Sequence, residues 1–343
     1  VDADFLNGKL SFTGDFFLKN TSDILLSLPI PEIVGVDAPM QNAGKVRNTG
    51  VELSLRHNNN IRDFNYHATF NISYVHNEIT DLSGGDIPGR SVGDPINNIY
   101  GYVCEGIFQN QAEIDAHPKQ VMGTPVPGDL KYADLNGDKV IDEKDRKSLG
   151  NYFPKLNFGL NLGFNYKNFD LTIFLYGSYG NKAMNYLSRR ITNPNSSGNV
   201  HASVANHARL GYLDGNSDNT DVWNMYILPG SNGLCRMSVN DANDNDRISS
   251  RYVEDASFLR IQNIALGYTL PKNWLKKLKI ENARIYANIK NVYTFTGYDG
   301  YDPEIGSTQA QYSYSGQSML MYGVDTGRCP SPRIYTFGID LTF

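Results

Sequence analysis

The chain has 343 residues, of which 40% are hydrophobic and 12% aromatic, and its formal net charge is -5. It contains no run of the ~18 apolar residues that a membrane-spanning helix needs, so a transmembrane helix is excluded. Because nucleic acids are bound mainly through basic surfaces, the negative charge also argues against a nucleic-acid partner.

The mean hydropathy of -0.41 does not exclude a β-barrel in a membrane, because barrel strands expose only alternate residues to lipid. The 22 tyrosines and 16 phenylalanines favour strands and the aromatic girdles of barrels. The three cysteines are an odd number, so we expect free thiols, with one disulfide as the alternative. The chain starts at Val1 without a secretory signal, and we expect it to be the tail of a longer polypeptide.

Alternation of apolar with small or polar residues predicts strands in the first quarter of the chain. Residues 10–19, 51–56 and 64–74 show this pattern, which places apolar side chains on one face of a strand and polar ones on the other. The short polar link from Asn58 to Asp63 predicts a hairpin.

The pattern returns in the second half of the chain. Residues 158–166 alternate, and Lys167-Asn168 predicts a two-residue hairpin into residues 169–175. Residues 257–270 and 283–293 form a further predicted pair. With residues 333–343 we expect about eight strands, each near the ~9–11 residues of a tilted membrane strand.

The last strand gives the clearest indication of what the apolar face contacts. Apolar side chains occupy every second position to the final residue, at Tyr335, Phe337, Ile339, Leu341 and Phe343. An aromatic carboxy-terminus that ends a two-faced strand indicates an antiparallel transmembrane β-barrel, with lipid outside and a wet lumen inside.

Three long segments separate the predicted strand pairs, at residues 80–154, 180–256 and 294–332. They are rich in Gly, Asn, Asp, Tyr and Pro. Short turns on one rim and long extracellular loops on the other are typical of outer-membrane barrels, whereas a compact soluble domain rarely has structureless loops of this length. The alternative is a soluble β-sandwich or jelly roll with elaborate loops.

An acidic segment in the first long loop matches the ligand spacing of an EF-hand-type calcium loop. Oxygen ligands at every second residue allow a short loop to wrap one hard cation, with the seventh position contributing its backbone carbonyl. The expected ligands at loop positions 1, 3, 5, 7, 9 and 12 are Asp134, Asn136, Asp138, Val140, Asp142 and Asp145.

Two residues depart from the usual calcium loop. Lys139 occupies the sixth position, where a sharp turn normally requires glycine, and Asp145 is shorter than the usual glutamate. We expect a structural Ca²⁺ that fixes the long loop, and the alternative is a solvated acidic turn.

A tyrosine-rich segment in the third long loop is a candidate for substrate contact. Aromatic rings beside amides and carboxylates suit sugar binding, whereas loop packing and a girdle are the alternative. The candidate residues are Tyr298, Tyr301, Tyr312 and Tyr314.

No catalytic motif is present. The sequence has no GxSxG, HExxH, phosphate-binding loop or dinucleotide fingerprint, and its six histidines lack metal-ligand spacing. We therefore expect no enzyme activity, although a membrane-embedded hydrolase with a Ser/His pair from different strands stays an alternative.

Motifs spread along the whole chain resemble the SusC/RagA family of TonB-dependent outer-membrane transporters. The matching segments, in order, are residues 44–53, 93–96, 100–102, 106–110, 127–129, 258–271 and 300–304, and the match ends at Phe343. The resemblance covers the carboxy-terminal third of that family, so residues 1–343 resemble the late strands of a barrel of about 22 strands.

The resemblance implies a nutrient importer in the outer membrane of a Gram-negative, Bacteroidetes-like bacterium. Such an importer takes up oligosaccharides, or sometimes peptides, under a SusD-like surface lipoprotein that acts as a lid, and TonB drives it through an amino-terminal plug with no counterpart here. The acidic loop is similar to one in the family's extracellular region. We expect Asn71, Asn157 and Asn161 to face the lumen. A peptide importer, a surface carbohydrate-binding β-protein and a passive porin are the alternatives.

Overall fold

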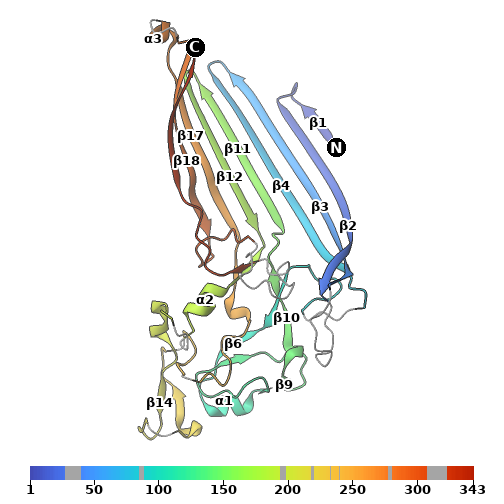
Figure 1. Ribbon diagram of the computed structural model, residues 1–343, viewed down its shortest axis with the longest axis vertical. Coiled ribbons are helices and arrows are strands. Elements are labelled where there is room, and N and C mark those ends of the chain that lie inside the picture. Colours follow the sequence, from blue (N-terminus) through green and yellow to red (C-terminus); the bar gives the residue numbers. More distant parts are fainter. Residues whose placement is uncertain are drawn as a thin grey trace.

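The computed structural model describes residues 1–27, 40–84, 89–193, 198–217, 220–231, 233–238, 240–276, 280–306 and 323–343. Its main element is an antiparallel sheet of nine strands, in which strands adjacent in the sheet follow one another along the chain (Figure 1). The strands are β1 (Asp2–Phe5), β2 (Leu10–Ser27), β3 (Met40–Ile61), β4 (Phe64–Asp81), β11 (Leu156–Tyr166), β12 (Phe169–Tyr179), β17 (Phe258–Thr269), β18 (Asn282–Thr296) and β20 (Ile334–Thr342).

The predicted hairpins are present, with tighter turns than expected in one case. Arg62-Asp63 joins β3 to β4, and Lys167-Asn168 joins β11 to β12. Arg62 and Lys167 have φ values of 55° and 53°, the left-handed backbone used in two-residue hairpins.

Two expectations about the strands were wrong. The sheet has nine strands in the described residues, because β1 folds back onto β2 through residues 6–9. The second error is length: β2, β3 and β4 have 18, 22 and 18 residues. Their pairing continues into polar sequence, where Asn77 Nδ2 donates to Asn48 Oδ1 at 2.7 Å.

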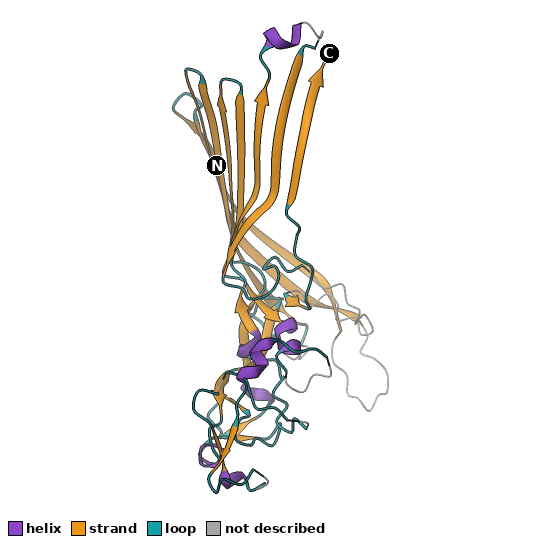
Figure 2. Cartoon of the chain, turned by 90° about the vertical axis from the view of Figure 1, so that its left-hand side faces the viewer, coloured by secondary structure: helices purple, strands orange, loops and turns teal. Residues whose placement is uncertain are grey.

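One face of the sheet is apolar and uncovered. Phe12, Leu55, Phe70 and Leu160 lie side by side across β2, β3, β4 and β11, and on β20 the side chain of Phe337 is 80% exposed. Figure 2 shows a single curved layer of strands. A β-sandwich would bury this face against a second sheet, so the sandwich alternative is wrong, and the exposed stripe is the arrangement of a lipid-facing barrel wall.

On the opposite, polar face, large rings lie over glycines of neighbouring strands. A Cβ added at Gly163 would lie 2.0 Å from Cε1 of His67, and one at Gly338 would lie 2.4 Å from the Tyr286 ring. These glycines therefore provide the space that the rings occupy.

An arginine links three strands near the turn end of the polar face and crosses a fourth. Arg284 on β18 donates to both carboxylate oxygens of Asp170 on β12, at 2.9 and 2.6 Å, and to Asp340 on β20 at 3.2 Å. The guanidinium crosses β17 above Gly267, where a Cβ would lie 2.5 Å from Nη2. The absence of a side chain at Gly267 makes this link possible.

The described residues of the long connections, 82–155, 180–257 and 297–333, lie together at the other end of the sheet (Figures 1 and 2). They are folded. Their strands are β5 (Asn98–Tyr102), β6 (Cys104–Ile107), β7 (Lys119–Gln120), β8 (Leu130–Tyr132), β9 (Val140–Ile141), β10 (Arg146–Asn151), β13 (Lys182–Asn185), β14 (Leu210–Tyr212), β15 (Met225–Ile227), β16 (Val253–Asp255) and β19 (Val324–Asp325).

The helices are short. The α-helices are α1 (Gln111–Ala116), α2 (Tyr186–Ile191) and, at the turn end of the sheet, α3 (Lys272–Leu275); the 3₁₀ helices are η2 (Glu143–Asp145), η3 (Ala202–Asn206), η4 (Val222–Asn224) and η5 (Ser250–Tyr252). Among the described residues, no helix has the length and apolar character needed to cross a membrane.

The described residues of connections 82–155 and 180–257 form what we call the loop body, which has its own hydrophobic core. Leu130, Tyr132 and Ile141 are fully buried in it and pack with Ile227 and Cys235. All three cysteines are free thiols, as expected, and burial raises the pKa of the Cys235 thiol to about 12.

Candidate functional site

The polar face of the sheet carries a shallow groove of about 370 Å³, which we call the polar groove. Asn71 and Asn157, which the sequence places in the lumen, line it, and Asn161 lies on the same face of β11. The residues that give it polar character are Thr13, Asp15, Glu52, Ser54, Asn71, Ser73, Asn157 and Tyr176. Hydroxyls, amides and carboxylates of this kind hold water and hydrogen-bonding solutes.

A buried arginine closes the loop end of this face. Arg260 on β17 is 3% exposed, and its Nε donates to Thr294 at 2.8 Å. Its two terminal nitrogens donate to Asp302 at 2.5 Å and Glu304 at 2.8 Å. One buried guanidinium thus fixes two carboxylates of the 297–333 connection above the polar face, through one charge-assisted hydrogen bond to each, and such bonds are stronger than those between neutral groups.

Arg260 is not among the site residues predicted from the sequence. It is the one cation in the predicted strand 257–270, and a lone arginine on a polar strand face, followed downstream by Asp302 and Glu304, is the signal that identifies such a site.

A buried ion pair joins the two halves of the loop body. Asp129 is fully buried, and Arg236 Nε donates to its Oδ1 at 2.9 Å. Asn245 donates to the same oxygen at 3.0 Å. Burial raises the pKa of Asp129, and the Arg236 charge opposes this shift. Residues of the second connection therefore bind the Pro-Gly-Asp motif of the first connection.

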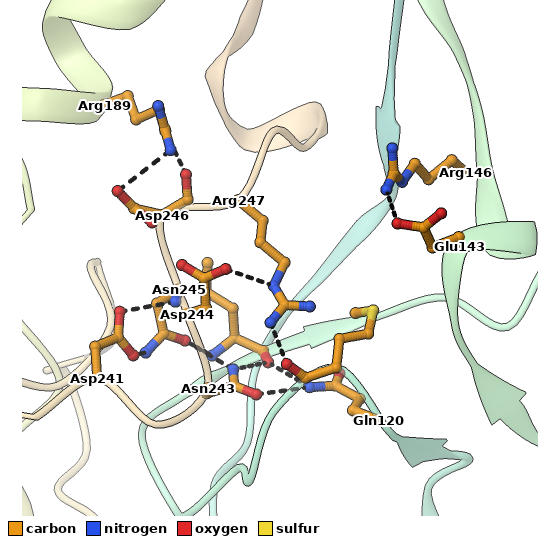
Figure 3. Close-up of polar contacts among 12 residues, drawn as sticks. Gln120, Glu143, Arg146, Arg189, Asp241, Asn243, Asp244, Asn245, Asp246 and Arg247 are labelled. Atoms are coloured by element: carbon orange, nitrogen blue, oxygen red, sulfur yellow. Dashed lines mark hydrogen bonds and ion pairs between the residues drawn. The ribbon is translucent and has the colours of Figure 1, made fainter. Parts of the chain in front are cut away.

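An amide network continues from this pair (Figure 3). Gln120 donates to Asn243 at 3.0 Å, Asn243 donates to Asn245 at 2.9 Å, and Asn245 donates to Asp241 at 2.7 Å. Because these buried amides satisfy one another, they fix the relative position of the two connections.

Charged pairs surround the network and leave a cavity of about 330 Å³ between Tyr100, Met122, Arg146 and Arg247. Arg247 pairs with Asp244 at 3.1 Å and Arg146 with Glu143 at 2.6 Å (Figure 3). Each guanidinium already has an acidic partner within the chain, so these contacts support the loop body.

The acidic loop has the backbone shape expected of a calcium loop. Lys139 has a φ of 65°, so the left-handed turn is formed there despite the missing glycine. The carboxylate of Asp134 accepts from the N–H groups of Gly137 at 2.7 Å and Lys139 at 2.9 Å. Val140–Ile141 pairs in parallel with Lys119–Gln120, which fixes the loop to the rest of the body.

The loop is held together by its own hydrogen bonds. Asp145 is fully buried and accepts from the N–H groups of Leu135 at 2.8 Å and Asp142 at 2.9 Å. Asn136 and Asp138 also accept from N–H groups within the loop. In the described ranges no three His, Cys, Asp or Glu side chains are arranged to hold a metal ion, so the calcium site stays a prediction.

The four candidate tyrosines have different positions. Tyr298 is buried, its hydroxyl donates to Asp325 at 2.7 Å, and it packs with Ala183, Ala256 and Ile305. Its ring is therefore part of a small core and presents no open face. Tyr301 is 63% exposed, and Tyr312 and Tyr314 lie outside the described residues.

Known proteins similar to this chain are TonB-dependent receptors. The chain is 30% identical over its whole length to TonB-dependent receptor P3 of Formosa agariphila and covers 33% of that protein. It is 28% identical, again over its whole length, to TonB-dependent receptor SusC of Bacteroides thetaiotaomicron and covers 31% of it.

A solved structure agrees with these sequence relatives. The structure of the RagAB peptide transporter matches the whole chain with a TM-score of 0.72 and 25% identity, and the chain covers 34% of the matched chain. This chain thus spans about a third of the length of the relatives it matches.

The family model described as "TonB dependent receptor-like, beta-barrel" matches residues 1–292. The match takes in the two-faced sheet except for the end of β18 and the whole of β20. With the sheet, its exposed apolar face and the full-length similarity taken together, the chain belongs to the TonB-dependent receptor β-barrel family, of the SusC/RagA type.

Proposed function

We propose that this chain forms the carboxy-terminal part of an outer-membrane importer that takes up oligosaccharides in a TonB-dependent manner. The observation that carries the proposal is the pair of faces on one sheet layer. The apolar face is exposed along its length, and the opposite face has a groove of hydroxyl, amide and carboxylate groups. A wall with lipid on one side and a polar passage on the other serves transport and requires no covalent step.

The partners follow from the same proposal. A SusD-like surface lipoprotein covers the loop end as a lid, and TonB acts through an amino-terminal plug that lies elsewhere in the parent protein. The folded loop body and the fixed carboxylates of the 297–333 connection give such a lid a rigid surface.

Oligosaccharides are favoured as cargo by the chemistry of the residues. The polar groove offers amide, hydroxyl and carboxylate groups that can hydrogen-bond to sugar hydroxyls. Tyr301 is exposed beside Asp302, and aromatic faces next to carboxylates suit sugar rings. Peptides are the second candidate, favoured by the similarity to the RagAB peptide transporter.

Transport in cells distinguishes these cargos. The full-length parent is expressed as the sole importer, and depletion of neutral oligosaccharides and of tripeptides from the medium is followed with and without TonB. We expect TonB-dependent depletion of an oligosaccharide. Depletion of tripeptides alone would show that the parent is a peptide importer. Recovery of the parent in the soluble fraction without detergent would instead favour a surface carbohydrate-binding protein.

We also propose that the acidic loop of residues 134–145 binds one Ca²⁺ with a structural role. The left-handed turn at Lys139 and the hydrogen bonds that Asp134 accepts from the loop backbone support this proposal. The residues that would hold the ion are those predicted from the sequence, with Asp145 closing the loop through its backbone contacts.

A further inference from the structure

A second polar cavity lies where the 297–333 connection meets the sheet, and we call it the rim cavity. Its volume is about 360 Å³, within the ~300–1,000 Å³ range of small-molecule sites. Its lining includes Tyr152, Asp302, Glu304, Gly306, Arg328 and Cys329.

Arg260 on the sheet fixes the acidic side of the rim cavity. Arg260 holds Asp302 and Glu304 as described above, and Asp302 Oδ2 also accepts from the N–H of Ser331 at 3.3 Å. The side chain of Asp302 is 12% exposed and that of Glu304 47% exposed. Glu304 is therefore held in place yet open to a ligand.

The basic side of the rim cavity is open. The Arg328 side chain lies over Gly306, where an added Cβ would be 2.6 Å from Nη1. Its backbone N–H donates to Asp325 at 3.3 Å, but its exposed guanidinium makes no ion pair or hydrogen bond with the described residues. Residues 307–322, which precede it in sequence, contain no acidic residue. Arg328 thus has donors to offer to a ligand.

The rim cavity adjoins the polar groove across one hydrogen bond. Tyr176 lines the polar groove, and its hydroxyl donates to Oε1 of Glu304 in the rim cavity at 3.5 Å. The two sites are therefore neighbours at the loop end of the polar face.

Charge identifies the kind of solute. Two guanidinium groups, Arg260 and Arg328, balance the two carboxylates, Asp302 and Glu304, so the rim cavity is neutral overall. Farther on, the described lining of the polar groove includes Asp15 and Glu52 and no basic residue. This route repels a polyanion, while a fixed acceptor beside a free donor matches neighbouring hydroxyl groups.

We propose that the rim cavity is a recognition subsite for an uncharged oligosaccharide on its way to the polar groove. Glu304 accepts from one sugar hydroxyl, and Arg328 donates to its neighbour. Arg260 is a positioning residue that acts through Asp302 and Glu304. This inference rests on the proposed oligosaccharide import.

The test uses the full-length parent in cells, with maltohexaose, laminarihexaose and xylohexaose as neutral probes. Oligogalacturonate serves as the acidic probe and a tripeptide pool as the peptide probe. The variants Glu304→Gln and Arg328→Gln each remove one charged hydrogen-bonding group from the exposed side of the cavity. We expect uptake of the neutral probe at limiting concentration to fall about tenfold in each, the usual effect of losing one such contact.

Two further changes alter the cavity without removing these groups. Gly306→Ala must displace the flexible Arg328 side chain and should lower uptake by a smaller factor. A bulky maleimide on the exposed Cys329 should block the cavity, and Cys329→Ser should make the cells insensitive to the reagent. Arg62→Gln and Glu281→Gln, both exposed at the turn end of the sheet, are matched controls and should transport like the parent.

The outcomes separate the two proposals. If a neutral hexasaccharide enters at the parental rate in both Glu304→Gln and Arg328→Gln, the rim subsite is wrong while oligosaccharide import stands. If oligogalacturonate is the probe that enters, the proposal that the rim cavity recognises an uncharged oligosaccharide is wrong. If only tripeptides enter, both proposals fail.

Discussion

Single buried charges organise this molecule at the residue scale. Asp129 joins the two halves of the loop body through Arg236, and Arg260 joins the sheet to the 297–333 connection. In each case the partner lies far away in sequence, 107 residues for Asp129 and Arg236. Removing one member of a buried pair leaves the other charge without compensation, which costs far more than losing an exposed pair.

We predict that Asp129→Asn destabilises the loop body by about 3 kcal/mol, because Arg236 then lacks its buried carboxylate. This corresponds to about a hundredfold higher population of the open state, measured as protease cleavage between residues 107 and 132 in the membrane-embedded parent. Glu143→Gln removes an ion pair whose acid is 83% exposed and is the control. Equal cleavage of the two variants would show that the Asp129 pair has no special role.

At the element scale, alternation predicted the strands because a barrel wall has two chemically different faces. Residues 158–166 and 335–343 were recognised for this reason, and the turn at Lys167-Asn168 followed from the same pattern. The ends of β2, β3 and β4 were not predictable, since polar pairs such as Asn48 and Asn77 carry no alternation.

The loop body was hidden from sequence reasoning for a related reason. Its core residues Leu130, Tyr132 and Ile141 lie on strands of two or three residues, too short to show a period. The Arg260 contacts depend on pairing across 42 and 44 residues, which local patterns do not encode.

The ring-over-glycine contacts of the polar face can be tested by a double-mutant cycle. Gly163→Ala places a methyl group where the His67 ring lies, and we predict a loss of about 1–3 kcal/mol, typical of overpacking. His67→Ala removes the ring, so adding Gly163→Ala to it should cost much less. Thermal unfolding of the full-length barrel in detergent measures the four free energies. Strict additivity of the two changes would contradict the contact.

We predict that Asp134→Ala and Asp138→Ala loosen residues 127–150 without abolishing membrane assembly, because both acids belong to the proposed calcium loop. Calcium chelation should increase protease cleavage in this segment of the parent protein, and should have no further effect on the two variants. Asp115→Ala, at an exposed position of α1, is the control. Calorimetric titration of the parent with Ca²⁺ that shows no heat of binding would remove the metal proposal.

At the scale of the whole molecule, the sheet is open. In the described structure β1 and β20 are its two edges, and each edge strand presents unpaired backbone N–H and C=O groups. In a membrane such groups must be paired, so open sheets do not span bilayers. The nine strands are therefore part of a larger closed barrel.

We predict that the 343-residue chain refolded alone in detergent does not form a closed, heat-resistant barrel. Because the edges of β1 and β20 lack partners, it should migrate in gels as unfolded protein with or without heating. Co-refolding with the remainder of the parent should restore a heat-modifiable band. A stable barrel from the chain by itself would contradict the reading of the sheet as a partial wall.

The Arg284 link has a consequence for how such a barrel is completed. One guanidinium ties β20 to β18 and β12 at the turn end, so contacts that reach across the neighbouring strands fix the position of the outer edge of β20. When a strand pairs with the outer edge of β20 to complete a barrel, the register of that new pair is therefore set by a strand whose own position is already fixed by Arg284.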